Sequence, residues 1–302
     1  MTSFEVPTCA RPLLQLFVEP LEVLLVSCLA EREFSADEAR VALERMTDEV
    51  WPLVRLEPFL LAAYRRGVLE LVEDGAAHFR VATFYDRLGV FVVAQAAEYL
   101  ALPDAARAEL DAWFFDTYLS RLGDEDAPSG DRVLTLGRTL EHIDRSEQPI
   151  WLNPCDCRTL AGHCDSPIDT CITFRSGINT LAHRGLSKPL TKAEAKAVVR
   201  TADAAGLLHT VNEDGVCNCC SDCCYLFRAQ AARGRGQVWP LAEEIATLDE
   251  AACIGCGRCV ERCPFGAFGW DGAAIAFDEG RCRGCGLCSD TCPAEAIEML
   301  PR

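Results

Sequence analysis

The chain has 302 residues, a net charge of −17 and 19 cysteines, and half of its residues are hydrophobic. This composition predicts a folded protein of two or three domains and excludes a disordered chain. Residues 1–150 hold 27 acidic against 14 basic side chains, which gives this half a charge of −13. Such a surface repels phosphate backbones, so we expect no nucleic-acid partner. It suits a redox partner protein with a basic docking face, although much of the charge also serves solubility.

Apolar runs are short in this sequence. It contains no stretch of about 18 uncharged apolar residues, the length that predicts a membrane-spanning helix. The best candidate, residues 13–30, carries Glu19, Pro20 and Glu22, which a spanning helix tolerates poorly. The N-terminus also lacks a basic start followed by an apolar core. We therefore expect no membrane span and a cytoplasmic location.

The N-terminal part reads as mainly helical, with one hairpin. Ser35 begins a helix, and Glu38 three residues later completes the pattern of a capping box. Two short β runs joined at Asp74-Gly75 predict a hairpin. The other expected helices cover residues 13–30, 52–66, 86–101 and 104–122. Three helices followed by a hairpin, over residues 13–84, resemble a winged-helix domain.

Two turn-rich segments, residues 123–130 and 231–240, predict domain boundaries. The domains expected from them are a helical, winged-helix-like domain (1–125), a cysteine-rich metal-binding domain (131–240) and a small C-terminal domain (245–302). The middle domain is expected to be irregular, apart from a helix with a capping box at Thr191 and Glu194 that ends at Gly206. The predicted fold class is therefore α+β.

The C-terminal region contains an internal repeat. The pattern Cys-x2-Cys-x2-Cys-x3-Cys-Pro begins at Cys253 and recurs 29 residues later at Cys282. This spacing lets a loop wrap one iron–sulfur cube and present a thiolate to each of three irons, while the fourth cysteine points toward a second cube. Glycines free the backbone to approach the inorganic sulfurs and to adopt positive φ. The expected cofactor-binding glycines are Gly255, Gly257, Gly284 and Gly286.

Over residues 250–299 the sequence resembles bacterial ferredoxins with two [4Fe-4S] clusters. The resemblance implies single-electron transfer, a crossed ligation, and packing of residues 267–268 and 296–297 between and over the clusters. One cluster would be bound by Cys253, Cys256, Cys259 and Cys292, and the other by Cys282, Cys285, Cys288 and Cys263. The segment that connects the two copies predicts a hairpin at Asp271-Gly272. Zinc is the alternative, but its sites use pairs of cysteines rather than three at a regular step.

Nine further cysteines lie in the middle of the chain: Cys155, Cys157, Cys164, Cys171, Cys217, Cys219, Cys220, Cys223 and Cys224. Neighbouring residues point in different directions on a regular backbone. The two adjacent pairs at the end of this run therefore predict two metal centres that share one loop, or one larger cluster bound from two sides. We expect one or two further iron–sulfur clusters; zinc and unligated thiols are the alternatives.

Four other residues carry hypotheses. His163 is a further candidate ligand because it adjoins Cys164. Arg158 either donates to a cluster or an acidic neighbour, or is an ordinary surface arginine. Cys9 and Cys28 are expected to be small hydrophobic residues, and Cys28 to be buried in an apolar helix.

The middle cysteine runs, followed by a dicluster module, resemble those of a group of iron–sulfur proteins from anaerobes. Crowded thiols also predict a reducing, anaerobic setting. We therefore expect an electron-transfer protein or subunit that relays single electrons to a partner oxidoreductase, rather than a stand-alone enzyme. Two alternatives stay open: a redox enzyme in which an open-coordinated middle cluster reduces a small molecule, and a redox-sensing regulator. No catalytic residue is assigned.

Overall fold

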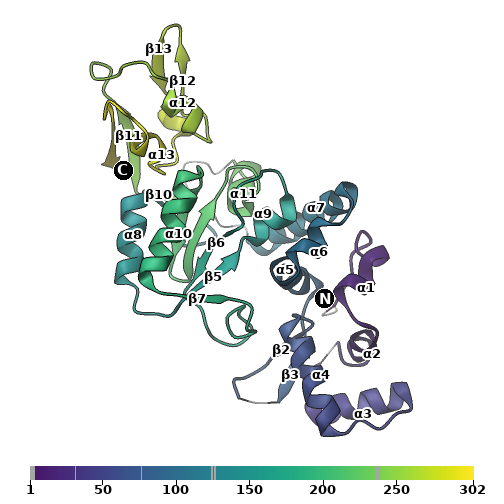
Figure 1. The fold of residues 1–302 in the computed structure, drawn as a ribbon. Helices are drawn as coiled ribbons and strands as arrows, with labels where there is room; N and C mark the ends of the chain where they lie inside the picture. Colours follow the sequence, from purple (N-terminus) through teal and green to yellow (C-terminus); the bar gives the residue numbers. More distant parts are fainter. Residues whose placement is uncertain (1–3, 31, 76, 124, 126, 235–238) are drawn as a thin grey trace. The chain divides into compact units, whose positions relative to one another are not determined.

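The structure is a computed structural model that describes residues 4–30, 32–75, 77–123, 125, 127–234 and 239–302. It has an α+β fold that divides into two compact units. The first unit comprises Met1–Thr117 and Ser176–Lys188, and the second comprises Tyr118–Arg175 and Pro189–Arg302. Figure 1 shows the elements of both units.

The first unit is mainly helical. Its helices are α1 (Leu14–Phe17), α2 (Pro20–Leu29), α3 (Ala36–Thr47), α4 (Leu53–Arg65), α5 (Phe84–Ala94), α6 (Ala96–Leu100) and the first part of α7 (Asp104–Arg121). Its strands are β1 (Phe34–Ser35), β2 (Leu69–Leu71) and β3 (His78–Val81). These strands form an antiparallel sheet in the order β1-β3-β2. The order of elements is consistent with the winged-helix resemblance, which stays a prediction.

Local sequence signals explain the helix ends. The predicted capping box of α3 is confirmed: Ser35 accepts from the amide of Glu38, and Glu38 accepts from that of Ser35. The single helix predicted over residues 13–30 is wrong, because the chain is extended at Val18 and Glu19 before α2. Pro20 then starts α2, since its missing amide proton is not needed in a first turn.

Residues 176–188 belong to the first unit, although they follow the middle cysteines in the chain. The Asn179 side chain accepts from the Leu71 amide and donates to the Leu71 carbonyl, each at 2.9 Å. Nδ1 of His183 lies 2.7 Å from the Tyr64 hydroxyl. Arg184 donates to the carbonyl of Leu69 at 3.0 Å. These bonds attach an excursion of the chain to strand β2 and helix α4, which a linear division into domains does not predict.

The second unit is built on a seven-stranded sheet in the order β10-β4-β8-β9-β6-β5-β7. Its strands are β4 (Arg132–Leu134), β5 (Ile150–Pro154), β6 (Asp169–Thr173), β7 (Lys188–Leu190), β8 (Leu208–Asn212), β9 (Gly215–Cys219) and β10 (Leu241–Ala242). The expectation of an irregular middle segment is therefore wrong. In β9, cysteines occupy alternate positions, and β6 contains a further cysteine. Because these cysteines were interpreted as metal ligands, the alternation of apolar and polar residues that identifies a strand was not recognised there.

Four helices accompany this sheet: α8 (Leu136–Arg145), α9 (Asp156–Ala161), α10 (Lys192–Ala204) and α11 (Tyr225–Ala232). Helices α8 and α10 lie side by side against the sheet, and Figure 1 shows them together. The core includes Ile143 of α8, Val199 of α10, and Ile172 and Val216 of the strands. The predicted capping box that begins α10 is confirmed.

The C-terminal segment forms two small antiparallel pairs. Its elements are β11 (Glu244–Leu248), α12 (Arg258–Arg262), β12 (Phe268–Asp271), β13 (Ala274–Phe277), η2 (Glu279–Arg281), α13 (Leu287–Asp290) and β14 (Ile297–Pro301). Strand β11 pairs with β14, and β12 pairs with β13. The hairpin predicted at Asp271-Gly272 is confirmed.

The two predicted boundary segments are described only in part. Residues 124 and 126 of the first, and 235–238 of the second, lie outside the described residues. Helix α11 continues into the second segment as far as Ala232, and Trp239 near its end is buried. In the described residues no single helix is long and apolar enough to cross a membrane. One bent pair, Arg11–Phe17 with Pro20–Leu29, reaches that length and composition jointly, at an angle of 106°.

Candidate metal centres

Eight thiols of the C-terminal segment surround two cavities. The first cavity is lined by Cys253, Cys256, Cys259 and Cys292. The second is lined by Cys263, Cys282, Cys285 and Cys288. Each cavity takes three cysteines from one copy of the repeat and the fourth from the other copy. We call these sets the first and second quartets. Their grouping is the one that the ferredoxin resemblance implies, and the metal they bind stays a prediction.

Glycines shape both loops. Gly255, Gly257, Gly284 and Gly286 all have φ between 67° and 79°, the left-handed region that L side chains rarely adopt. Gly257 and Gly286 immediately precede α12 and α13, which carry Cys259 and Cys288. At Gly284 a Cβ would lie only 2.1 Å from the carbonyl oxygen of Glu244. The second loop therefore depends on glycine for space as well as for conformation.

Backbone amides point at three of the thiols. The amides of Ala267, Ala296 and Gly284 donate to the sulfurs of Cys263, Cys292 and Cys282 at 3.3 to 3.4 Å. Hydrogen bonds of this kind tune a bound iron–sulfur cluster. Burial raises the pKa of the Cys285 thiol to about 12. Metal binding must therefore release a proton from this sulfur.

The cavity walls are otherwise mostly apolar, although Arg258 lines the first cavity and Arg283 the second. Ala296 and Ile297 line the first cavity, and Ala267 and Phe268 line the second. All four are buried, in the positions that the ferredoxin resemblance implies. Four convergent thiols, amide donors and a mainly apolar wall fit a [4Fe-4S] cluster, which is held by four thiolates and is tuned by hydrogen bonds to sulfur.

Residues 246–299 match the family described as the 4Fe-4S dicluster domain. A comparison with curated proteins gives no match. The chain therefore contains a ferredoxin-like iron–sulfur segment, here called the dicluster domain, whose role is electron transfer.

In the middle segment, three cysteines share one face of the sheet. Cys171 on β6 alternates with Ile172, and Cys217 and Cys219 on β9 alternate with Val216. Ile172 and Val216 belong to the core beside α8 and α10. Because successive side chains in a strand point to opposite faces, the three thiols lie on the face away from that core.

Three more thiols join them at the ends of neighbouring elements. The β5–β6 register shifts at Asn153/Pro154, immediately before Cys155 at the start of α9. Cys157 follows in α9, and Cys224 immediately precedes α11. Together with Cys220 they line a cavity of about 160 Å³. We call Cys155, Cys157, Cys171, Cys217, Cys219 and Cys224 the six-thiol group.

Hydrogen bonds connect the six-thiol group. The sulfurs of Cys219 and Cys224 share a hydrogen bond at 3.3 Å, and Thr210 Oγ1 lies 3.4 Å from the Cys219 sulfur. Hydrogen bonds from Cys157 and Cys171 hold the pKa of Cys155 well below its usual value. Hydrogen bonds from Cys157 and Cys219 likewise lower the pKa of Cys224. Cys155 and Cys224 are therefore the most readily formed thiolates of the group.

Arg158 provides a buried positive charge at this site. It is 2% exposed and lines the same cavity, so its interpretation as a surface arginine is wrong. Its guanidinium donates to the Asn218 carbonyl at 2.8 Å and to Thr170 Oγ1 at 3.3 Å. Burial alone would lower the pKa of Arg158, but the thiolates of Cys155 and Cys220 outweigh burial and raise it. The charge balances thiolates, and Nε has no hydrogen-bond partner among the described atoms.

Cys220, at the wall of that cavity, also belongs to a second set, the three-thiol group of Cys164, Cys220 and Cys223. Their sulfurs and a carboxylate oxygen of Asp222 all lie within 4.8 Å of one another. The adjacent pairs thus divide between two sites, with Cys219 and Cys224 in one and Cys220 and Cys223 in the other. His163 is not a member of this set; its Nδ1 lies 3.2 Å from the Asp222 carbonyl oxygen.

Sequence reasoning missed several residues of these sites. Asp222 was overlooked as a candidate ligand, although it stands between two cysteine pairs. The contact of Phe227 with Phe265, whose ring centroids are 5.3 Å apart, has no sequence signal. The expected burial of Cys28 is wrong: it is exposed on α2, whose core-facing side is occupied by Leu25 and Leu29. Cys9 is half-buried.

Proposed function

We propose that this protein relays single electrons from a partner protein through the dicluster domain to a further iron–sulfur centre at the six-thiol group, and onward to an oxidoreductase. The main support is that the two thiol quartets and the six-thiol group lie in one compact unit. Direct side-chain contacts connect the second quartet's surroundings to helix α11, which follows the six-thiol group. When bound, a [4Fe-4S] cluster stores and releases one electron.

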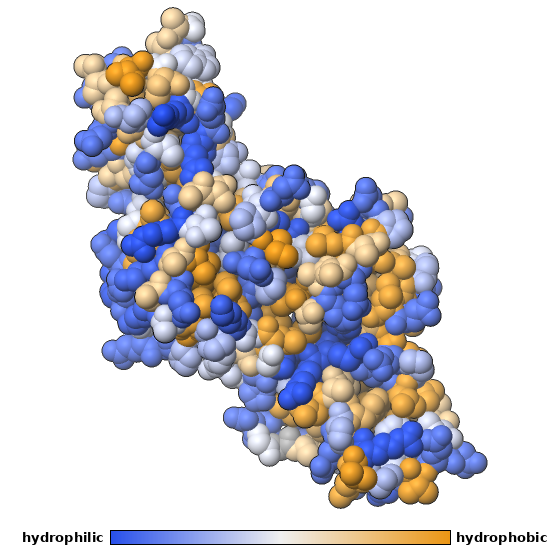
Figure 2. All heavy atoms as spheres, in the orientation of Figure 1, coloured by the Kyte–Doolittle hydropathy of each residue, from blue (hydrophilic) through white to orange (hydrophobic). Residues whose placement is uncertain are grey.

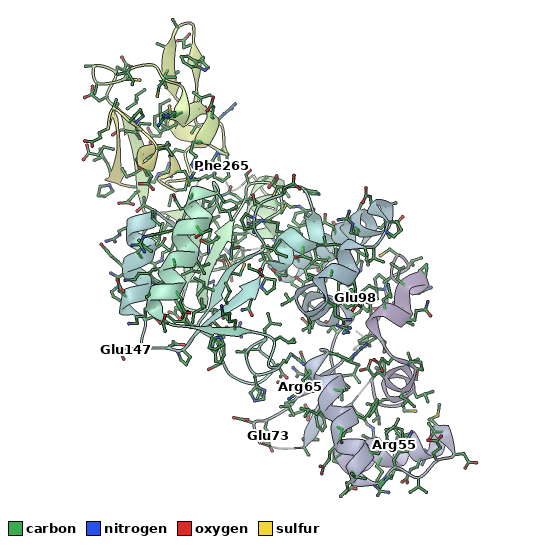
Figure 3. The ribbon with its side chains drawn as sticks, viewed as in Figure 1. Arg55, Arg65, Glu73, Glu98, Glu147 and Phe265 are labelled. Carbon is green, nitrogen blue, oxygen red and sulfur yellow. The ribbon has the colours of Figure 1, made fainter. Side chains whose placement is uncertain are left out.

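A short route supports transfer between the dicluster domain and the six-thiol group. Cys224 of that group precedes α11, and Phe227 lies in the first turn of this helix. The Phe227 ring contacts Phe265, which lines the second cavity beside Cys263. Phe265 is labelled in Figure 3, at the base of the dicluster domain. Arg283 reinforces the junction, because its Nε donates to the Gln230 side chain of α11 at 3.2 Å.

The first quartet suits electron entry. Cys256 is exposed, and the neighbouring Ile254 is 68% exposed. In the second quartet, by contrast, Cys282, Cys285 and Cys288 are all buried. A partner protein can therefore approach the first quartet closely, while the second quartet faces the middle segment through Phe265. This asymmetry supports a direction of transfer from first quartet to second quartet to six-thiol group.

The first unit suits a protein partner better than a nucleic acid. The outward face of α4 presents Leu53, Val54 and Leu61, and Figure 2 shows apolar side chains at the surface of this unit. Arg55 of α4 (Figure 3) is paired with Glu49 at 2.7 Å, so its charge is already neutralised. With the net charge of −13 over residues 1–150, these features support a docking role toward a partner with a basic face. Crowded thiols further support a reducing, anaerobic cytoplasm as the setting.

A second candidate function is a redox enzyme. The six-thiol cavity is also lined by polar groups that are not thiols, including Thr210, Asp131 and Tyr118. Such groups would position a small molecule at a centre with an open coordination site. This candidate predicts that the reduced protein, without a partner, turns over a small acceptor catalytically, whereas a relay gives up only its stored electrons.

Iron and sulfide analysis with EPR of the reduced, anaerobically prepared protein tests the relay. We expect clearly more than about eight irons per chain, the content of two cubes. The double variant Cys155→Ser/Cys171→Ser should fall to about eight and keep the dicluster signals, while Cys28→Ser should match the wild type. A wild-type content of only about eight irons would remove the middle segment from the relay.

The route is tested separately by rapid-mixing reduction. Phe265→Ala should slow reduction of the middle centre relative to the dicluster domain, and Phe265→Tyr, which keeps the ring, should not. Equal rates in the wild type and both variants would contradict a path through this contact.

A further inference from the structure

We infer that Cys164, Cys220, Cys223 and Asp222 bind a single divalent metal ion of zinc type, distinct from every iron–sulfur centre of the chain. This site would complete the assignment of the middle cysteines. It does not depend on the relay, because a mononuclear ion without redox activity passes no electrons.

The spacing of the ligand atoms carries this inference. Two thiolates that bind one tetrahedral zinc ion at about 2.3 Å lie about 3.8 Å apart. The sulfurs of Cys164 and Cys223 are 3.6 Å apart, and all four ligand atoms fall within 4.8 Å of one another. Thiolates on different irons of a cube are held farther apart, because the edge of the cube separates them in addition to two iron–sulfur bonds.

The other thiols of the chain provide an internal comparison. Among the described residues, this is the one set of three or more such ligand atoms that converge so closely. Neither quartet of the dicluster domain does so, although each surrounds its own cavity. The structure thus separates the open quartets of the dicluster domain from one tight set with room for an ion. The six-thiol group belongs to neither kind, because only its Cys219 and Cys224 sulfurs are described at such a short distance, 3.3 Å, and its described residues contain no such set of three.

The surroundings fit a closed structural site. Cys220 and Cys223 are buried and pack against Ala202 of α10 and against Leu207. Asp222 is exposed, and its carboxylate covers the outer side of the set. One carboxylate oxygen, Oδ1, accepts from the Cys223 amide at 3.0 Å, which fixes the orientation of the carboxylate. Three thiolates and one carboxylate complete the four ligands of a tetrahedral ion.

An ion at this site would also organise its neighbour. Cys164 follows α9, whereas Cys220 and Cys223 lie on the loop between β9 and α11. Binding would fix this loop against the end of α9. The same loop carries Cys219 and Cys224 toward the six-thiol group. The ion would therefore position two thiols of the adjacent centre without being part of it.

The test uses the full chain, prepared without oxygen, with zinc and iron measured on the same sample. We expect about one zinc per chain. Cys164→Ser should lose the zinc and keep the roughly eight irons of the dicluster domain, while Cys28→Ser, an exposed thiol elsewhere, should keep both metals. Cobalt exchanged into the wild type should give the absorption of tetrahedral, thiolate-bound Co²⁺. The cobalt spectrum reports the site even if a variant folds poorly.

Three results would overturn the inference. The first is a wild-type chain that binds neither zinc nor tetrahedral cobalt. The second is a Cys164→Ser chain that loses about four irons instead of zinc, because the three thiols would then hold a cube. The third is an Asp222→Asn chain with an unchanged cobalt spectrum and affinity, because the carboxylate would then not be a ligand. Iron content and EPR report the relay separately, so either proposal can fail alone.

Discussion

Gly284 shows why the loop of the second quartet requires glycine, which has no Cβ. Its φ of 67° equals that of Gly255 in the first loop. The two positions differ in their neighbours. A Cβ at Gly284 would meet the Glu244 carbonyl at 2.1 Å and Ala242 at 2.9 Å, whereas a Cβ at Gly255 would meet nothing within 4 Å. Substitution of Gly255 therefore tests the free-energy cost of the left-handed conformation alone. Substitution of Gly284 adds the cost of a steric clash with β11.

Alanine at these two glycines should have unequal effects. Gly255→Ala should lower the free energy of unfolding by about 1–2 kcal/mol, the cost of a left-handed alanine. Gly284→Ala should cost a further ~1–3 kcal/mol, because the β11 backbone must move. Denaturant titration monitored by the absorbance of the clusters measures both. Equal losses would show that the loop moves away from β11 without strain.

Arg158 should be indispensable to the middle centre because it is a buried cation among thiolates. Replacing it with glutamine leaves those thiolates without a balancing charge, a loss of about 3–5 kcal/mol. We expect Arg158→Gln to lose the iron of the middle segment and to melt at a lower temperature. The matched control is Arg175→Gln, since Arg175 is 63% exposed and pairs with Asp214 at 3.6 Å. A normal iron content in Arg158→Gln would contradict the charge-balancing role.

At the scale of elements, helix α10 links the sheet to the three-thiol group. Val199 packs in the sheet core, and Ala202 contacts Cys220 and Cys223. Asp203 lies 3.5 Å from Nε2 of the buried His209 on β8. A weakened α10 should therefore affect the three-thiol group as well as the sheet.

The capping residue of α10 gives a direct test. Thr191→Ala removes the acceptor of the Glu194 amide and should cost about 1 kcal/mol of stability. Thr201→Ala, at an exposed position of the same helix, should be neutral or slightly stabilising, because alanine is the better helix former. Chemical denaturation followed by circular dichroism compares the two. A loss in Thr201→Ala as large as that in Thr191→Ala would argue against the cap as the cause.

Local signals in the sequence predicted the elements whose causes are local. The capping boxes at Ser35 and Thr191 and the hairpin at Asp271-Gly272 depend on residues a few positions apart. The grouping of the C-terminal cysteines into two quartets was implied by the resemblance to two-cluster ferredoxins, not by spacing alone. The middle sheet was missed because its strands pair across long intervals, as β4 does with β8. The division of the nine middle thiols into six and three depends on that pairing, so spacing alone left several groupings open.

At the scale of the whole molecule, contacts within the second unit connect the dicluster domain to the sheet. Arg262 of α12 donates to the carbonyls of Asp203 and Ala204 at the end of α10. Gly206 lies against the same guanidinium, since a Cβ there would be 3.3 Å from its Nη1. These bonds fix the orientation of the dicluster domain within this unit.

Arg262→Ala should uncouple the dicluster domain from the sheet. Loss of the charged hydrogen bonds should cost about 1.5–3 kcal/mol and let the domain melt as a separate transition. Parallel melts, followed by cluster absorbance and by circular dichroism, should coincide in the wild type and diverge in the variant. Arg281→Ala, which removes a 65% exposed arginine paired with Asp278, is the control. Coincident melts in Arg262→Ala would show that other contacts hold the domain.

The pairing of β11 with β14 brings the two ends of the dicluster domain together, with Glu244 opposite Pro301. Because its first and last strands are paired, the domain can be inserted into a host chain at one site without distorting the host or the domain. The same geometry makes it portable: a graft at that seam, or a circular permutation that closes it, should leave both thiol quartets intact. The dicluster domain should therefore keep its fold when it is transferred to another chain.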